Sequence, residues 1–70
     1  MKEITATMAG TVLNVLVANG DNVSAGQEVL MLESMKMEIP IESEINGLIK
    51  ELKVSIGDFV NEGDVLIIVE

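Results

Sequence analysis

The sequence predicts an all-β domain, a small barrel or sandwich in which two copies of one unit pack together. Three observations lead to this fold class. Nine valines and eight isoleucines make β-branched residues abundant, and such residues suit half-buried strands better than helices. Short apolar segments alternate with turns that are rich in Gly, Asn and Asp, as in small all-β folds. The third observation is an internal repeat.

The repeat emerges when the chain is offset against itself by 37 residues. Residues 4–33 then align with residues 41–70, and residues 34–40 join the two copies. Neither copy could bury an apolar face alone, so we expect them to pack on each other about a pseudo-twofold axis. Such an axis places the joint at one end of the domain and the two termini at the other. The aligned pairs include Ile4 with Ile41, Gly10 with Gly47, Val23 with Val60, and Glu33 with Glu70.

Each copy is expected to contain about four short strands. In the first copy, residues 4–8 alternate apolar and polar side chains, as a half-buried strand does. Residues 11–17 are rich in β-branched side chains, Val23 is a short apolar anchor, and residues 28–33 predict a strand that runs into the joint.

The second copy repeats this pattern at residues 37–45, 48–54, 59–60 and 65–69. Pro40 has no backbone N–H, so the first of these segments is expected at an edge or beside a bulge. Six glycines are expected to supply the turns that lead the chain around the barrel. They are Gly10, Gly20, Gly26, Gly47, Gly57 and Gly63.

The composition narrows the possible functions of this single domain of residues 1–70. The absence of cysteine and histidine excludes disulfides, thiolate or imidazole metal sites, and imidazole catalysis. A formal net charge of −8 argues against nucleic-acid binding and against direct contact with an anionic membrane. No apolar run approaches the length of a membrane span, and the N-terminus lacks a signal-peptide pattern. These features predict a soluble cytoplasmic protein.

The sequence also argues against a phosphate-binding site and a metal site. Glycine-rich turns can hold phosphate, but Asp21 and Asp58 follow the glycines here and would repel an anion. The carboxylates of Asp21, Glu42, Glu44 and Asp64 lack the spacing of an EF-hand loop. We therefore expect structural turns and no metal site.

The joint carries the strongest candidate for function, Lys36, within the run Glu-Ser-Met-Lys-Met-Glu of residues 33–38. The pseudo-twofold places this run at a hairpin tip, where a lysine could serve merely to increase solubility. Yet the tip lacks Gly and Asn, which two-residue hairpin turns favour because they adopt positive φ easily. Met35 and Met37 are also poor choices for an exposed tip on stability grounds. A local rule that is broken without structural gain indicates a functional position.

This run resembles the attachment motif of biotinyl domains, in which a lysine between two methionines is biotinylated. The framework around it is similar too, with Met-Ala-Gly-Thr-Val at residues 8–12 and Gly-Asp-Phe-Val at residues 57–60. The resemblance covers about residues 4–69. It implies the hammerhead fold, a flattened β-barrel of two four-stranded antiparallel sheets with pseudo-twofold symmetry, and it places Lys36 at the central hairpin tip.

The sequence departs from related patterns in three ways. Ser34 stands where the commonest biotinyl motif has Ala, and lipoyl domains usually carry Asp-Lys-Ala around their lysine. Glu33 occurs in both classes and does not discriminate between them. The spacing from Gly10 to Gly20 leaves no room for the inserted thumb of bacterial acetyl-CoA carboxylase carriers. Small stand-alone biotin/lipoyl attachment proteins, some of which accept either cofactor, are similar in length.

The resemblance implies a biotin carrier, covalently biotinylated on Lys36, that shuttles CO₂ as carboxybiotin between active sites. The implied partners are a biotin protein ligase, a biotin carboxylase, and carboxyltransferase or decarboxylase subunits. The domain itself is expected to be monomeric and non-catalytic. We hypothesise that the ligase recognises Met35 and Met37 as apolar contacts, together with Glu33 and Ser34.

Two alternatives remain open. Lipoate could occupy Lys36 in place of biotin, which would make the chain a lipoyl or dual carrier. The domain could also be an unmodified interaction module, as in related hairpin domains of membrane-fusion proteins. The complete Met-Lys-Met run counts against the second alternative.

Overall fold

The computed structural model describes residues 2–70, and all regular structure in that range is β-strand. Two four-stranded antiparallel sheets form the domain, with strand orders β1-β8-β6-β3 and β5-β4-β2-β7. No helix within these residues is long and apolar enough to cross a membrane. The strands are β1 (Lys2–Thr5), β2 (Gly10–Val15), β3 (Asn22–Val23), β4 (Glu28–Ser34), β5 (Met37–Glu42), β6 (Gly47–Leu52), β7 (Phe59–Val60) and β8 (Val65–Val69).

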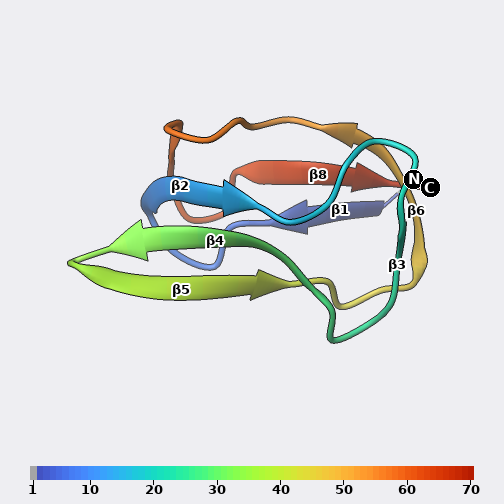
Figure 1. Ribbon diagram of the computed structural model, residues 1–70, viewed down its shortest axis with the longest axis horizontal. Coiled ribbons are helices and arrows are strands. Elements are labelled where there is room, and N and C mark those ends of the chain that lie inside the picture. Colours follow the sequence, from blue (N-terminus) through green and yellow to red (C-terminus); the bar gives the residue numbers. More distant parts are fainter. Residues whose placement is uncertain (1) are drawn as a thin grey trace.

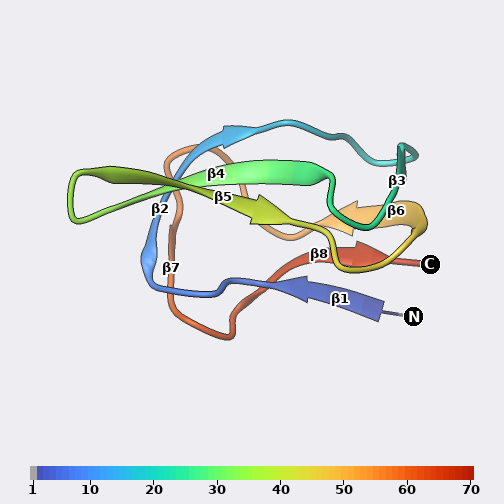
Figure 2. The same cartoon turned by 90° about the horizontal axis from the view of Figure 1, so that it is seen from below.

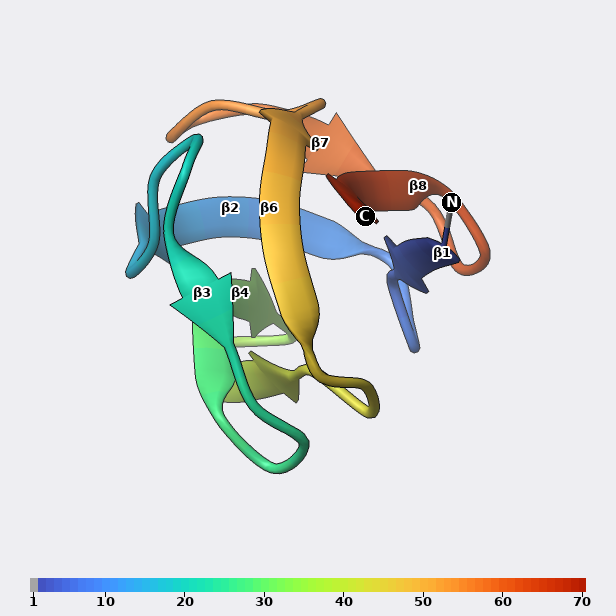
Figure 3. The same cartoon turned by 90° about the vertical axis from the view of Figure 1, so that its right-hand side faces the viewer.

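The two sheets are related by the internal repeat. A shift of 37 residues carries β1, β2, β3 and β4 onto β5, β6, β7 and β8, and it converts one strand order into the other. Each sheet therefore contains two strands from each copy, so the two copies interlock and do not pack as separate halves. Figures 1 and 3 show the two sheets facing each other around a shared interior. The predicted all-β flattened barrel is confirmed.

The core between the sheets is apolar and draws equivalent residues from both copies. Repeat-related pairs such as Val12 and Ile49, or Leu32 and Val69, are each at most 1% exposed. Burial of these branched side chains is the main force that holds so small a domain together. The buried polar Ser43 satisfies its hydroxyl locally, donating to the Ile45 carbonyl at 2.6 Å and accepting from the Ile45 N–H at 3.2 Å.

Four glycines form the predicted turns because the backbone there needs positive φ. Gly20, Gly26, Gly57 and Gly63 have φ between 89° and 95°, which a side chain would strain. At three of these turns an aspartate follows the glycine and its carboxylate accepts a backbone N–H three residues earlier, for example from Ser55 at 2.8 Å. The repeated Gly-Asp pairs are thus turn-forming units.

The prediction of a turn is wrong at Gly10 and Gly47, which begin β2 and β6. Close approach of neighbouring backbone explains the glycine at both positions. A Cβ on Gly10 would lie 2.7 Å from the Glu33 carbonyl oxygen, and one on Gly47 would lie 2.7 Å from that of Glu70. These glycines allow β2 and β6 to lie close to the ends of their paired strands β4 and β8.

Strand ends also differ from the sequence-based expectation. The first strand spans Lys2–Thr5 instead of residues 4–8, and β5 ends at Glu42 although extension was expected to residue 45. The chain leaves the sheet there because the Ser43 carbonyl accepts the N–H of Gly26 at 2.7 Å, across a loop. Pro40 lies in β5, an edge strand of its sheet, as its missing N–H predicts.

The domain measures 31 × 19 × 18 Å, and its long axis separates the hairpin from the two termini. The β4–β5 hairpin turns at one end, while Lys2 of β1 pairs with Val69 of β8 at the other (Figure 1). The joint between the copies therefore projects away from the ends of the chain, as the pseudo-twofold requires.

Candidate functional site

The hairpin of β4 and β5 carries the central run to the end of the domain. Ser34 pairs with Met37 as the last partners of the two strands, which leaves Met35 and Lys36 as a two-residue turn. Figure 2 shows this turn extending beyond the rest of the barrel. The strands beneath it are anchored by Leu32, which is fully buried. Lys36 is thus placed on a rigid support at the hairpin tip.

The backbone at the tip is left-handed at both turn residues. Met35 has φ of 53° and Lys36 has φ of 66°, and they are the only non-glycine residues with positive φ among residues 2–70. Positive φ at both central positions is the geometry of a type I′ turn, which normally selects Asn and Gly. Each side-chain-bearing residue held there costs about 1 kcal/mol or more. The turn keeps Met and Lys despite this cost, so stability does not select them.

The side chains of the tip are open to solvent. Met35 is 92% exposed and Met37 is 64% exposed, and Lys36 is exposed between them. Lys36 makes no hydrogen bond or ion pair with any residue in the range that the structure describes. Its amine can therefore be approached freely and acylated. Among residues 2–70, no group hydrogen-bonds to this amine as a general base would.

The remaining predicted recognition residues lie at the base of the tip. Glu33 pairs directly with Glu38 across the hairpin and with Thr11 on the other side. Ser34 is half-buried, and its Cβ would be 3.4 Å from a Cβ on Gly10. The structure thus brings Ser34 and the two methionines around Lys36, and it places Glu33 one residue pair further back.

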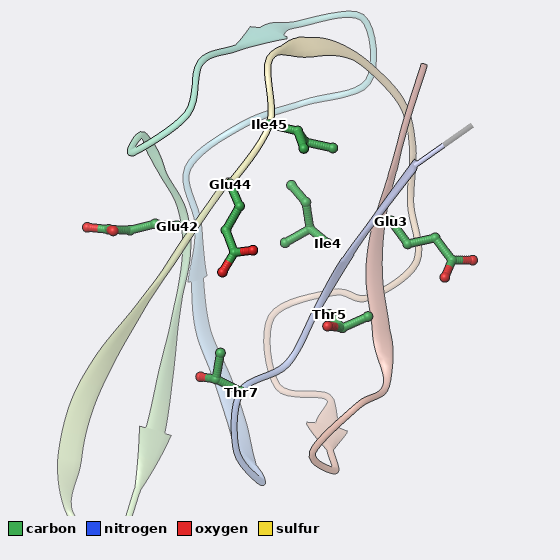
Figure 4. Close-up of a pocket in the computed structure, with 7 residues that line it drawn as sticks. All are labelled: Glu3, Ile4, Thr5, Thr7, Glu42, Glu44 and Ile45. Carbon is green, nitrogen blue, oxygen red and sulfur yellow. The ribbon is translucent and has the colours of Figure 1, made fainter.

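A pocket of about 130 Å³ lies elsewhere, between the edge strand β1 and the chain that follows β5. Ile4 and Ile45 face each other across this space, while Glu3 and Glu42 point away from it on opposite sides (Figure 4). None of its lining residues comes from residues 33–38, and no hydrogen-bonded nucleophile is present among them. The pocket is therefore separate from the hairpin tip.

No cluster suited to a metal ion is found among the described residues, since no three carboxylates converge there. Glu42 and Glu44 are both exposed, as the alternation along residues 37–45 predicts. The chemistry of the site is therefore that of one accessible amine on a rigid turn.

Comparison with known proteins identifies the family of the chain. The family model of biotin/lipoyl attachment domains, described as "Biotin-requiring enzyme", matches residues 2–69. The chain is 55% identical over 64 residues to the biotin/lipoyl attachment protein of Bacillus subtilis (strain 168), covering 91% of this chain and 88% of that protein. It is 35% identical over 68 residues to the biotinylated protein TB7.3 homolog of Mycobacterium leprae (strain TN), covering 97% and 96%.

A solved structure extends the comparison to a larger assembly. The urea carboxylase of Kluyveromyces lactis superimposes with a TM-score of 0.91 at 26% identity, over 99% of this chain and 6% of that chain. The fold, the projecting lysine and the match over nearly the whole length point the same way. The chain therefore belongs to the biotin/lipoyl attachment domain family.

Proposed function

We propose that Lys36 is the attachment residue and that the chain presents a covalently bound biotin to carboxylase active sites. The chain is a non-catalytic biotin carrier, a role supported by its family and by its biotinylated relatives. The single observation that carries the choice of residue is the left-handed Met35-Lys36 turn, which projects the amine and costs stability.

Attachment requires a separate ligase. The neutral Nζ of Lys36 attacks the acyl carbon of an activated acyl-adenylate, an amide bond forms, AMP leaves, and the amine gives up a proton. The ligase must supply the base, since no residue within 2–70 makes a hydrogen bond or ion pair with Lys36. Met35 and Met37, both largely exposed, offer the apolar contacts that the ligase would use to recognise the tip.

The domain then acts as the rigid base of a swinging arm. Biotin, when attached to Lys36, would supply the chemistry that carries CO₂, and the role of the chain is to hold and present it. Tethering raises the effective concentration of the carried group at each active site without its release. Biotin-dependent carboxylases are the partners that the comparisons support, and we place the carrier between a carboxylating enzyme and a transferase or decarboxylase.

Lipoate is the second candidate group for Lys36, because the Bacillus subtilis relative is named for both cofactors. The exposed tip would accommodate either acyl group. The Met-Lys-Met sequence favours biotin, since lipoyl domains usually carry Asp-Lys-Ala at the corresponding turn.

The intact mass of the chain purified from its native host tests the proposal, with Lys36→Ala as the control. One added biotinyl mass that the control lacks is the expected result. A lipoyl mass would replace biotin with the second candidate. If no mass is added even with ligase co-expressed, or if the Lys36→Ala chain is still modified, the proposal fails.

Recognition by the ligase can be tested separately with Met35→Gln and Met37→Gln. Each substitution removes an apolar contact while keeping side-chain length, so we expect kcat/KM of the ligase to fall by about tenfold. The matched control is Leu48→Gln, since Leu48 is 38% exposed and lies in β6, in the sheet that does not carry the hairpin. Unchanged kcat/KM for both tip variants would show that the ligase does not contact the methionines.

A further inference from the structure

Besides the methionines of the hairpin, four large apolar side chains remain exposed in β2, in β7 and in the residues directly beside these two strands. Ile56 and Phe59 are 64% and 66% exposed, and Leu16 and Leu13 are 47% and 36% exposed. Single exposed apolar residues are common on any protein, but a contiguous group marks an interaction surface. We call Leu13, Leu16, Ile56 and Phe59 the apolar face.

The pairing of strands brings these residues together. Phe59 of β7 lies opposite Thr11 of β2, and Leu13 stands two residues further along β2 as its diagonal neighbour. Diagonal neighbours on one side of a sheet are within reach of an aromatic side chain. The N–H of Gly57 donates to the Val12 carbonyl at 2.8 Å, which places the turn containing Ile56 beside the same strand.

Leu16 extends the apolar face toward β4. Its N–H donates to the Val29 carbonyl at 2.9 Å, so the chain still follows β4 at this point. Val15 and Val17 on either side are packed against or within the core, so Leu16 points outward. The four residues thus lie along β2, in the neighbouring strand β7 and in the turn before β7.

The internal repeat provides a control for whether the fold needs these residues. Apart from Ser43, which aligns with Ala6, the buried side chains are apolar in both copies, as Val12 with Ile49 and Val23 with Val60 show. The apolar face has no such counterpart. A shift of 37 residues replaces Leu13 and Leu16 by Lys50 and Lys53, and it replaces Ile56 and Phe59 by Asn19 and Asn22. The same fold is therefore built with polar residues at these four positions, and the apolar face serves something other than folding.

The surroundings of the apolar face are acidic and lead to the attachment site. Phe59, Thr11, Glu33 and Glu38 pair in one row across all four strands of the sheet, so the face is continuous with the base of the hairpin. Asp58 adjoins Phe59 and is exposed. Apart from Lys36, the lysines of the chain lie in β1, in β6 or just after β6. A protein that binds this face should present apolar side chains surrounded by basic residues.

We propose that the apolar face docks the carrier on the enzyme that carboxylates its biotin, through an apolar patch rimmed by Lys or Arg. The identity of this partner rests on the proposed function. Carboxylation of the attached biotin is a step that biotin-dependent carboxylases share, whatever their acceptor substrate. We therefore assign the apolar face to the enzyme that catalyses this step. Docking by the side of the sheet leaves the tip free to extend its arm into an active site.

Two other occupants fit less well. A second copy of this chain would bring two acidic surfaces together, and the formal charge of −8 opposes that. The ligase must reach Nζ of Lys36 itself, so its contacts centre on the tip, whereas the apolar face extends back along β2. An enzyme that acts at the end of an arm has no such restriction.

The variants that test this proposal copy residues from one half of the chain to the other. One double variant, Ile56→Asn with Phe59→Asn, introduces the residue type that the other copy carries at Asn19 and Asn22. The second, Leu13→Lys with Leu16→Lys, introduces the residue type found at Lys50 and Lys53. The matched control is Leu48→Thr, because Leu48 is 38% exposed on the other sheet and its repeat partner is Thr11. Thermal unfolding should be similar for all of them.

Binding is measured by calorimetric titration of the biotin carboxylase component of the same host with the Lys36→Ala chain as parent. This parent cannot be modified, so the result does not depend on the cofactor. We expect each double variant to raise Kd by about tenfold or more, and Leu48→Thr to change it by less than about twofold. Equal Kd values for parent and double variants, or no binding by the parent, would overturn the proposal.

Two side measurements distinguish the other occupants, using chains that retain Lys36. Sedimentation should show a monomer, and a dimer that Ile56→Asn with Phe59→Asn dissociates would assign the face to a second copy. The ligase should modify this double variant at the parent rate, and a slower rate with unchanged Kd would assign the face to the ligase. If the chain never gains biotin, the proposed function fails. The docking proposal is still tested in that case, because the binding assay does not need biotin.

Discussion

The hairpin tip and the glycine turns solve the same backbone problem with different residues. Gly20, Gly26, Gly57 and Gly63 adopt positive φ where the chain bends around the barrel, and each is followed within a residue by a polar side chain. At the tip, positive φ falls on Met35 and Lys36. The turns have the residues that the backbone prefers, whereas the tip has residues that the backbone disfavours.

This contrast separates two kinds of constraint. At a glycine turn, the fold alone determines the residue, because any side chain would strain it. At the tip, the proposed recognition and acylation of Lys36 by a ligase would explain the choice better than folding does. The backbone strain is confined to the turn, because the fully buried Leu30 and Leu32 anchor β4 in the core below it.

The largest effect is expected at the lysine itself. Lys36→Arg keeps the charge and the backbone strain but removes the acylable amine, so biotinylation should be lost completely while the free energy of unfolding changes by less than about 0.5 kcal/mol. Lys53→Arg is the control and should be labelled like the parent, as measured by mass. Labelling of Lys36→Arg would move the attachment site to another lysine.

The strand glycine Gly47 should show the largest loss of stability. In Gly47→Ala the new Cβ would lie 2.5 Å from Cγ1 of Val69 and 2.7 Å from the Glu70 carbonyl oxygen. We expect the free energy of unfolding in urea to fall by about 2–3 kcal/mol through overpacking. A loss below that of a turn glycine would mean that the end of β8 moves aside easily.

A smaller effect is expected where only positive φ is at stake. Gly57 has φ of 95° and open space around it, so Gly57→Ala should cost about 1–2 kcal/mol in urea unfolding. Met35→Ala at φ of 53° should change stability by less than about 0.5 kcal/mol, because a Cβ is already present. Equal losses of stability in Gly57→Ala and Met35→Ala would show that the glycine turns and the tip do not differ in this way.

The smallest effect tests the strain at the tip directly. Replacing Met35 and Lys36 by Asn and Gly supplies the residues that a type I′ turn prefers, and it should raise the free energy of unfolding by about 1 kcal/mol. The same chain should gain no biotin. A destabilised double variant would show that the methionine or the lysine contributes to folding after all.

Most of the fold could be predicted because the evidence for it is local or repeated. The offset of 37 residues predicted two copies packed about a pseudo-twofold axis with the joint at one end, and the absence of Gly and Asn at the turn made Lys36 a candidate functional residue. That the copies interlock, with two strands of each in either sheet, was not predicted. Gly10 and Gly47 were misplaced in turns because their role is contact with a distant strand, which composition does not reveal. The end of β5 depends likewise on a hydrogen bond from Gly26 to Ser43 across a loop.

The apolar face could not be predicted from alternation along the chain. Leu13 lies at a bulge in the pairing of β2 with β4, where the simple inside–outside period fails. Phe59 belongs to a strand of two residues, too short to show a period. A signal was nevertheless present in the repeat, because apolar residues that align with Lys or Asn in the other copy mark these positions.

The pairing of Lys2 with Val69 has a consequence for protein engineering. Under the repeat, β8 and β1 stand in the same relation as β4 and β5, but no turn joins them. A circular permutant that links these strands through Glu-Ser-Met-Lys-Met-Glu and opens the chain elsewhere would create a second copy of the proposed acceptor lysine. The two lysines would stand at opposite ends of the 31 Å long axis, which would convert a monovalent carrier into a bivalent one.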